Sequence, residues 1–289
     1  MYEKFQLSKP IEGKKEMVEM PDGTRIFTIV SGSGNTTILL AHGYGFSHIE
    51  WNIIVERLNQ LNYRTIVFDQ RGHGQSTIGQ GGISSSSMAS DYKNLIEHFN
   101  LKDCILVGHS MGGFLSMKFL LDYPEMQHTN VKSCLLMATF AGEINKNNLQ
   151  NRLQIPLIKS GLLLKMIQWK PIGEQFGKSL IGENPDPELV RVIQEVFLQQ
   201  DHSKLVPILK AFGDESYYDS LKNITIPCTI VIGDKDATTP QFHTDNIIKE
   251  IPNATRIDIV GKGHCLNACL LYTSPSPRDA TLSRMPSSA

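Results

Sequence analysis

Short, mostly apolar runs alternate along this chain with segments in which apolar residues recur every three or four positions. The runs are short and rich in β-branched side chains, a pattern that predicts buried β-strands. The predicted strands are residues 16–20, 25–30, 37–41, 64–68, 104–107, 131–138, 228–232 and 257–260. The sequence Pro21-Asp22-Gly23-Thr24 between the first two runs is typical of a turn, so these two strands are expected to form a hairpin.

Helical periodicity occupies most of the gaps between these strands. The predicted helices cover residues 51–61, 88–99, 111–123 and 240–251, and a Gly/Ser-rich stretch that ends at Ser87 is predicted to be a solvated loop. Strands that alternate with helices, several of them apolar throughout, are typical of a parallel sheet covered on both faces. The sequence therefore predicts an α/β fold, a mostly parallel sheet flanked by helices.

The alternation stops between residues 140 and 206, where no strand is apparent. This segment contains an interrupted apolar run, 155–169, and a helix with Asp186 as its N-cap and Pro187 as its first residue. It is too apolar to remain solvated as a linker. We expect residues 140–206 to form a helical cap, inserted into one discontinuous core domain made of residues 1–139 and 207–268.

One stretch has the composition of a catalytic turn. Val107-Gly108-His109-Ser110-Met111-Gly112-Gly113 lies between a predicted strand and a predicted helix, with glycines two positions either side of Ser110. A serine on so sharp a turn has a strained backbone, and its neighbours must be nearly free of side chains for strand and helix to meet. The turn places the amide of Met111 at a helix N-terminus, where it can donate to a developing oxyanion. The alternative is a glycine-rich turn with an idle serine.

A serine nucleophile needs a base, and the base needs an acid that orients it. Candidates follow two further predicted strands, in Gly233-Asp234-Lys235-Asp236 and in Gly261-Lys262-Gly263-His264. The order serine, acid, histidine along the chain is the one expected when loops at the carboxyl edge of one sheet supply a triad. From spacing to the strand alone, Asp234 and Asp236 are both candidates for the acid.

Taken together, these motifs resemble the α/β-hydrolase superfamily. The resemblance covers residues 25–268 and rests on motifs in the expected order: His42-Gly43, Asp69-Gln70-Arg71-Gly72-His73-Gly74, Gly108-His109-Ser110-Met111-Gly112-Gly113, Gly233-x-x-Asp236-x-x-x-Pro240 and Gly263-His264. The chain is similar to the esterase- and lipase-like members that have a serine nucleophile and a helical cap. Epoxide hydrolases and haloalkane dehalogenases of the superfamily need an aspartate where Ser110 stands.

The resemblance implies a role for each of these residues. Ser110 would attack a carbonyl carbon, His264 would take its proton and return it to the leaving group, and Asp236 would hold the imidazole and stabilise the imidazolium. The backbone amides of Met111 and Tyr44 would form the oxyanion hole.

The acid has two alternatives. The family spacing Gly-x-x-Asp-x-x-x-Pro favours Asp236 over Asp234. Some relatives carry the acid after the preceding strand, where Glu143 stands in this chain. Asp236 is therefore the predicted acid, with Asp234 and Glu143 as alternatives.

Several other polar side chains are expected near the strand ends. The histidines among them are His42, His73, His109 and His264. They lack the spacing of metal ligands, so no metal site is predicted, and His42 or His73 is expected to tie a loop by hydrogen bonds. Asp69 and Arg71 are interpreted as structural residues that pin loops beneath the site.

The predicted insertion gives the best indication of the substrate. Its helices are expected to lie over the carboxyl edge of the sheet as a lid, leaving an apolar cleft above Ser110. The predicted substrate-binding side chains are Tyr44, Leu163, Met166 and Trp169. The alternatives are that the lid residues only pack the lid onto the body, or that they form a membrane-docking amphipathic helix.

The predicted function is that of a serine hydrolase that cleaves a small-molecule carboxylic ester through an acyl-enzyme, with an apolar acyl or alcohol group favoured and no cofactor needed. Cleavage of a thioester, a lactone or a carbon–carbon bond, or perhydrolysis, can run on the same triad. A ligand receptor or inactive scaffold is the alternative from another class. An intact triad argues against it, because a pure binder does not need an acid–base pair.

The composition of the chain limits the classes of binding partner that can be expected. The 289 residues carry a formal net charge of -1, which gives no electrostatic reason to expect nucleic acid or an anionic membrane as a partner. No apolar run approaches the ~20 residues that a membrane span needs, and the first residues do not resemble a signal peptide. Cys104, Cys134 and Cys228 lie in predicted core strands and are expected to be buried and reduced. We therefore expect a cytoplasmic protein that acts on a small molecule, without stable membrane insertion; the composition does not indicate an oligomeric state.

Residues 269–289 do not continue the alternation of predicted strands and helices. Cys269-Leu-Leu-Tyr-Thr-Ser-Pro-Ser-Pro-Arg-Asp279 resembles an in-frame translation of a transposon-derived adapter used in sequencing libraries, and Arg284-Met-Pro-Ser-Ser-Ala289 resembles its continuation. The stretch has no helical period, although the last triad loop is expected to be followed by a helix that packs on the sheet. We expect 269–289 to be a non-native tail that begins after about Ala268; the alternative is a genuine disordered tail.

Overall fold

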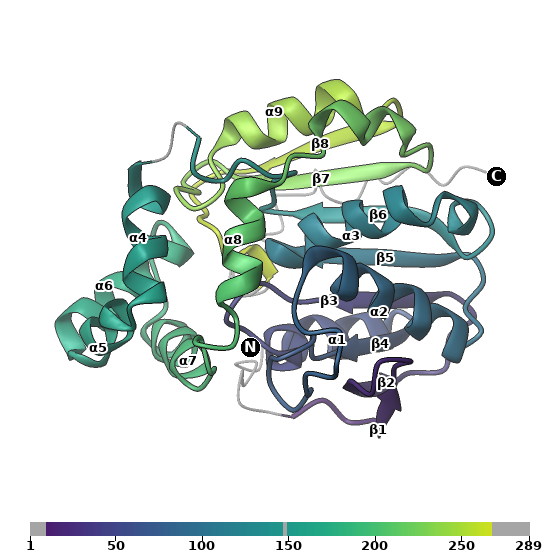
Figure 1. Ribbon diagram of the computed structural model, residues 1–289, viewed down its shortest axis with the longest axis horizontal. Helices are drawn as coiled ribbons and strands as arrows, with labels where there is room; N and C mark the ends of the chain where they lie inside the picture. The colour runs from purple at the N-terminus through teal and green to yellow at the C-terminus, as the bar shows by residue number, and fades with distance from the viewer. Residues whose placement is uncertain (1–9, 147–148, 268–289) are drawn as a thin grey trace.

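The computed structural model describes residues 10–146 and 149–267, and its centre is one eight-stranded sheet (Figure 1). Strands β1 (Lys14–Glu19) and β2 (Arg25–Ser31) form the predicted antiparallel hairpin. The parallel strands are β3 (Thr37–Ala41), β4 (Arg64–Phe68), β5 (Cys104–His109), β6 (Val131–Met137), β7 (Cys228–Gly233) and β8 (Ala254–Ile259). Their order across the sheet is β1-β2-β4-β3-β5-β6-β7-β8. Each predicted strand is present, with small shifts at its ends.

Helices cover both faces of this sheet. Helices α2 (Ser85–His98), α3 (Met111–Asp122) and α9 (Gln241–Glu250) contribute apolar side chains to the core on one face. Helix α1 (Asn52–Gln60) packs on the other face, where Val55 is buried. Because strands that are apolar on both faces need cover on both, the predicted α/β fold with flanking helices is confirmed.

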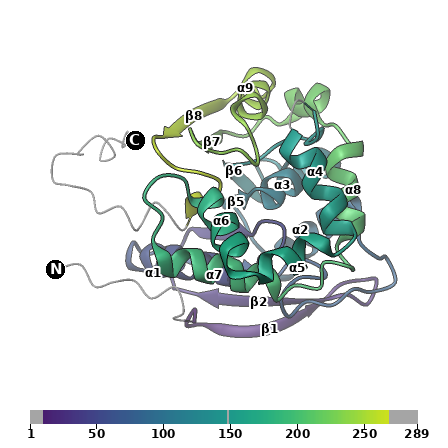
Figure 2. The ribbon, with the colours of Figure 1, turned by 90° about the vertical axis from the view of Figure 1, so that its left-hand side faces the viewer.

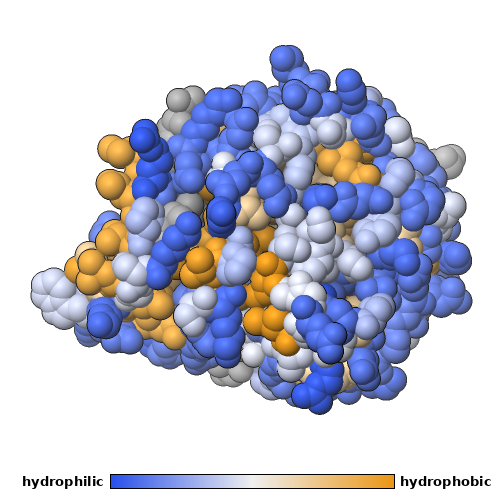
Figure 3. All heavy atoms as spheres, viewed as in Figure 1, coloured by the Kyte–Doolittle hydropathy of each residue, from blue (hydrophilic) through white to orange (hydrophobic). Residues whose placement is uncertain are grey.

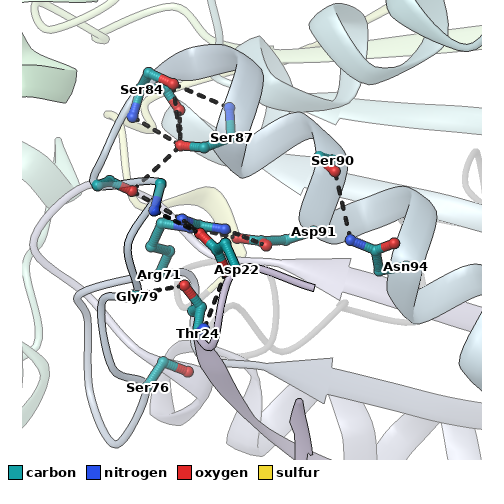
Figure 4. Close-up of polar contacts among 12 residues, drawn as sticks. Asp22, Thr24, Arg71, Ser76, Gly79, Ser84, Ser87, Ser90, Asp91 and Asn94 are labelled. Carbon is teal, nitrogen blue, oxygen red and sulfur yellow. Dashed lines mark hydrogen bonds and ion pairs between the residues drawn. The ribbon is translucent and has the colours of Figure 1, made fainter. Parts of the chain in front are cut away.

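The start of α2 corrects the predicted loop that ends at Ser87. The helix begins at Ser85, and Ser84 is its N-cap (Figure 4). The Ser84 hydroxyl accepts the amide of Ser87 over 3.0 Å, and the Ser87 hydroxyl accepts the amide of Ser84 over 2.9 Å. Serine is a weak helix former, but this reciprocal capping satisfies amides of the first turn. The helix therefore starts before the apolar periodicity does.

Arg71 holds the loop after β4 in place from a buried position. Its Nε and Nη2 donate to the two carboxylate oxygens of Asp91 over 3.0 and 2.8 Å, and its Nη1 donates to the carbonyl of Gly82 over 2.8 Å (Figure 4). The same Nη1 pairs with Asp22 in the first hairpin. One guanidinium thus joins a turn, a loop and a helix, as a planar group with five donors can.

In the described part of the segment 140–206, four helices lie at one end of the sheet (Figure 1), and Figure 2 shows the molecule from that end. They are α4 (Leu149–Lys159), α5 (Leu162–Gln168), α6 (Lys170–Ile181) and α7 (Pro187–Leu198). The carboxylate of Asp186 accepts the amides of Glu188 and Leu189, so α7 begins as its predicted N-cap requires. Helix α8 (Val206–Asp214), which was not predicted, follows directly and leads to the 3-10 turn η3 (Tyr218–Asn223).

Smaller features complete the described chain. Two further 3-10 turns are η1 (His48–Trp51) and η2 (Pro124–Met126). Cys104, Cys134 and Cys228 are buried with free thiols. Within residues 10–146 and 149–267, no helix is both long and apolar enough to cross a membrane. The proposed tail, 269–289, lies outside the described residues.

Candidate active site

Ser110 lies on the sharp turn between β5 and α3. Its backbone angles are φ 52° and ψ −115°, a strained conformation for a residue with a side chain. A Cβ atom on Gly108 would overlap the carbonyl oxygen of Gly112, and one on Gly112 would overlap that of Ala41. Both glycines are therefore needed for strand and helix to come this close. The hydroxyl of Thr139 donates to the Ser110 carbonyl over 2.7 Å and supports the turn.

The three side chains predicted to form a triad are in contact. Ser110 Oγ lies 2.9 Å from His264 Nε2, and His264 Nδ1 lies 2.9 Å from Asp236 Oδ2. All three residues are buried. Because the hydroxyl and the carboxylate face opposite ring nitrogens, the imidazole can accept a proton at Nε2 while its Nδ1–H remains on the carboxylate.

The loop after β7 aims the Asp236 carboxylate at the ring. The amides of Thr238 and Thr239 donate to Oδ1 over 2.8 and 2.9 Å, and the Thr239 hydroxyl donates to Oδ2 over 2.7 Å. Burial alone would raise the pKa of Asp236, but the adjacent His264 and the Thr239 hydrogen bonds outweigh it and hold the pKa below its ordinary value. The carboxylate therefore stays charged where it meets the imidazole.

The two alternative acids have other partners. Asp234 Oδ1 accepts the amide of Gly261 over 2.7 Å and so helps to shape the loop before His264. Glu143 pairs with Lys146 at 2.6 Å. The structure thus brings Asp236 to the imidazole, as the family spacing predicts, and gives the two alternatives other contacts.

The two predicted oxyanion amides belong to chain segments that meet at Ser110. Met111 is the first residue of α3, where amide groups have no acceptor within the helix. Tyr44 follows Gly43 in the loop after β3. A Cβ atom built on Gly43 would lie 3.4 Å from the Cβ atom of Ser110, so this loop passes directly beside the serine.

A cavity of about 100 Å³ opens at Ser110 and His264. Its apolar wall is formed by Phe46, Phe140, Ile144, Ile158, Leu163, Phe176, Leu180, Phe197, Leu209 and Phe212. Asn151, Ser179 and Thr238 add polar groups, and the lining residues that the structure describes include no Asp, Glu, Lys or Arg. On the outer surface, apolar residues gather between α8 and the helices α4–α7 (Figure 3).

Of the four predicted substrate-binding side chains, two line the cavity and two do not. Tyr44 and Leu163 line the cavity, whereas Met166 and Trp169 are not part of its wall. Leu163 and Ile167, four positions apart, form the buried face of α5, as helical geometry requires. Met166 is half-buried on that helix, and Trp169, just beyond it, is 65% exposed.

His42 and His73 tie loops beneath the site. His42 Nε2 accepts the amide of Gln70 over 2.9 Å, and its Nδ1 donates to the carbonyl of Gly43 over 2.7 Å. His73 Nδ1 lies 3.2 Å from the carbonyl of Arg71. Burial lowers the pKa of both rings, to about 3 for His73, so both are neutral. No group of three or more His, Cys, Asp or Glu side chains in the described part of the chain is arranged to hold a metal ion.

Asp69 holds neighbouring loop residues in place by hydrogen bonds. Its Oδ1 accepts both the amide and the ring Nδ1 of His48, over 2.6 and 2.8 Å, and its Oδ2 accepts the amide of Gln75 over 2.8 Å. Burial would raise the pKa of Asp69, but the contact with His48 outweighs it and the pKa is lowered. The geometry agrees with the interpretation of Asp69 and Arg71 as structural residues.

Other groups at the site were not predicted from the sequence. The pattern Asp236-x-x-Thr239 is a local turn signature that could have indicated Thr239. Asn151 has no such signature: it is buried on α4 and donates to the carbonyls of Ile144 and Thr238 over 3.1 and 2.8 Å, which joins this helix to the loop of the acid.

Comparison with known proteins gives a consistent set of similarities. The family model described as "alpha/beta hydrolase fold" matches residues 36–268. The non-heme chloroperoxidase CPO-A1 of Kitasatospora aureofaciens is 27% identical over 254 residues, which cover 84% of this chain and 90% of that protein. The bromoperoxidase from Bacillus anthracis has a TM-score of 0.76 at 22% identity, covering 90% of this chain and 96% of the other. The esterase EaEST from Exiguobacterium antarcticum has the same TM-score and identity, covering 90% and 98%. Both structural likenesses show the fold.

Proposed function

The chain belongs to the alpha/beta hydrolase fold family, and we propose that it is a serine hydrolase that cleaves a small carboxylic ester through an acyl-enzyme intermediate. The observation that carries this proposal is the series Ser110 Oγ, His264 and Asp236, joined by two contacts of 2.9 Å. A serine hydroxyl is a weak nucleophile on its own. A neutral imidazole within hydrogen-bond distance activates it by accepting the proton as the attack proceeds.

In the proposed acylation, Ser110 Oγ attacks the ester carbonyl carbon while His264 Nε2 takes the hydroxyl proton. The electron pair of the C=O double bond moves onto the carbonyl oxygen, to which the amides of Met111 and Tyr44 donate. Collapse of this intermediate breaks the bond to the alkoxy oxygen, which takes the proton from His264 and leaves as the alcohol. Asp236 keeps its charge and stabilises the imidazolium.

In the proposed deacylation, water takes the place of the alcohol. His264 removes a proton from the water, whose oxygen attacks the acyl carbon. The bond to Ser110 Oγ then breaks, the serine regains its proton from His264, and the carboxylic acid leaves. No redox step occurs, and the residues named supply every proton transfer.

The volume and the lining of the cavity favour a substrate with a short, uncharged acyl group. Its volume of about 100 Å³ is smaller than the ~150 Å³ of an apolar cavity that takes up benzene. Burying a carboxylate or an ammonium group without a partner is costly. The described lining residues include no Asp, Glu, Lys or Arg to pair with one, and His109 is already in contact with Glu50. We therefore infer that neutral esters with short acyl chains react fastest.

We further propose that the segment 140–206 acts as a cap over the triad. Leu163, Phe176 and Phe197 come from its helices and line the same cavity as Ser110. Leu209 and Phe212 extend the same wall from α8, just beyond the proposed boundary. Side chains of the cap and of α8 would together set the length of acyl chain that fits.

The proposal is tested with a fluorophosphonate probe and a panel of p-nitrophenyl esters of graded acyl length, with Ser110→Ala as the control. We expect one adduct, on Ser110, and turnover that is lost in the variant. A folded wild-type protein that forms no adduct and hydrolyses none of the esters would favour a ligand-binding role instead. Thioester and lactone substrates in the same panel separate the other bonds that this triad can cleave.

Perhydrolysis is the second candidate function, favoured by the 27% identity to a protein named as a non-heme chloroperoxidase. Hydrogen peroxide would replace water in the deacylation, so that the acyl-enzyme yields a peroxy acid with no change in the serine, histidine or aspartate. Assay of peroxy acid formation from a short carboxylate or ester in the presence of peroxide tests it. Hydrolysis without peroxy acid formation would exclude this candidate.

A further inference from the structure

A buried ion pair lies directly behind the nucleophile. Glu50, in η1, and His109, the residue before Ser110, contact each other through Oε1 and Nδ1. The two side chains are almost completely excluded from solvent. His109 lies within the motif of the nucleophile turn, whereas Glu50 belongs to none of the motifs that define the triad.

Each member of the pair holds a second chain segment. Glu50 Oε2 accepts the amide of Gly43 over 2.8 Å, and His109 Nε2 lies 2.9 Å from the carbonyl oxygen of His264. Gly43 precedes Tyr44, whose amide is a proposed oxyanion donor. The pair therefore connects the oxyanion loop, the nucleophile turn and the loop of the base.

The groups that face the two ring nitrogens favour a charged ring. Nε2 of His109 lies 2.9 Å from a backbone carbonyl oxygen, which can only accept, so Nε2 carries a proton. Nδ1 contacts the Glu50 carboxyl group, which in its ionised form favours a proton on this nitrogen as well. Burial would lower the pKa of His109, but Glu50 outweighs it and the pKa is raised; burial would raise the pKa of Glu50, but His109 outweighs it and the pKa is lowered. Both pKa shifts favour the charged forms of the two groups.

We propose that Glu50 and His109 are positioning residues: an ion pair that sets the spacing of the oxyanion amides, Ser110 and His264 for the proposed hydrolysis. The inference rests on the proposed function. A buried ion pair is a costly way to gain stability, because removing two charges from water offsets much of their attraction. Proton transfer and oxyanion binding are sensitive to misplacement of the reacting groups by about 1 Å, and the pair holds together the three chain segments that carry these groups.

The charged and titratable groups that face the pair come from several elements. His42, at the end of β3, faces Glu50, while Asp236 and His264, in the loops after β7 and β8, face His109. His42 is held neutral by its own hydrogen bonds and burial. When the Glu50 charge is lost, Asp236 is an anion that still raises the pKa of His109.

The test compares Glu50→Gln with Asp91→Asn. Both substitutions remove the anion from a buried ion pair at nearly constant volume, but the Arg71–Asp91 pair contacts neither the triad nor the oxyanion loop. For Glu50→Gln we expect kcat to fall about 10- to 100-fold, with KM within about twofold of the wild type. We also expect kcat of Glu50→Gln to depend on pH through the titration of His109, because this ring has lost its counter-ion. The wild type should lack this contribution. For Asp91→Asn we expect a lower Tm with kcat and its pH profile unchanged.

A second measurement does not depend on activity. In ¹⁵N-histidine-labelled wild-type protein, with His109→Gln used for assignment, NMR at about pH 8 should show protons on both ring nitrogens of His109. A neutral His109, or equal kcat values for Glu50→Gln and Asp91→Asn, would overturn the proposal. If Glu50→Gln does not fold, Glu50→Asp takes its place. This variant keeps the charge but shortens the side chain, and its kcat is again compared with that of Asp91→Asn. Retained turnover in Ser110→Ala would instead refute the proposed function and leave the NMR result to decide the ion pair.

Discussion

The amide of Gly263 donates to the carbonyl oxygen of Ile181 over 2.8 Å, which joins the loop of the proposed base to the end of α6. Two positions further on, the amide of Cys265 donates to the carbonyl of Leu180, also over 2.8 Å. His264 lies between these two bonds. The helices at the end of the sheet therefore contribute to the placement of His264 as well as to the cavity wall.

Gly263→Ala should weaken this connection. A Cβ atom at residue 263 would lie 2.8 Å from the Leu180 carbonyl oxygen and 3.0 Å from the amide nitrogen of Gly182, so the base loop and α6 would have to separate. We expect kcat to fall about tenfold or more. The matched control is Gly161→Ala, which strains a left-handed residue between α4 and α5 but meets no atom within 4 Å; it should lower Tm slightly and leave kcat unchanged. Equal kcat values for the two variants would contradict the connection.

Asp236→Asn should reduce kcat by up to ~10⁴-fold, because an amide at this position favours the wrong imidazole tautomer. Asp234→Asn is its neighbour-matched control, since an amide oxygen can still accept the Gly261 amide, and kcat should change little. Glu143→Gln should likewise preserve activity. Steady-state kinetics on a p-nitrophenyl ester provide the comparison, and loss of activity in either control with retention in Asp236→Asn would reassign the acid.

Leu163→Ala should shift the preference toward longer acyl chains, because it removes a side chain from the cavity wall. Leu162→Ala is the matched control: the same substitution one position earlier, at a side chain that is 48% exposed and is not part of the wall. The ratio of kcat/KM for a longer ester to that for a short one should rise only in the first variant. Unchanged ratios in both would show that α5 does not limit the acyl group.

Stability should decrease on acidification from neutral pH. Burial lowers the pKa of His42, His73 and His243, to about 3 for His73 and about 4 for His243. In the unfolded chain these rings bind protons below about pH 6.5. The unfolded state then holds more protons, so the free energy of unfolding falls with pH, by up to about 1.4 kcal/mol per pH unit for each ring.

The lowered pKa values of the Asp236 and Glu50 carboxyl groups extend this loss below about pH 4, where the unfolded chain protonates them first. Urea denaturation at several pH values between about 8 and 4 measures the slope, and His243→Gln should make it shallower. A free energy of unfolding that is constant from about pH 8 to 5 would show that the buried histidines do not contribute.

The sequence by itself determined the sheet and the three residues that meet at its edge. Parallel strands are buried on both faces, so each appears as a continuous apolar run that is visible without any knowledge of its neighbours. Ser110, Asp236 and His264 each follow such a run. Because the carboxyl ends of parallel strands lie at one edge of the sheet, residues far apart in the chain could be predicted to come together there. Gly108 and Gly112 indicated the turn in the sequence, because the close approach of strand and helix leaves no room for a side chain at either position.

Only the tertiary structure decided which side chains complete the site. Leu162 and Leu163 are identical in type and adjacent, and the orientation of α5 against the body determines that one is exposed and the other lines the cavity. Glu50 has no local signature, because its partners, Gly43, His109 and, through it, His264, come from separate segments of the chain. Periodicity in a sequence records which face of an element is apolar. The choice of partner for a buried charge depends on how the loops cross, and that is established only when the whole sheet is assembled.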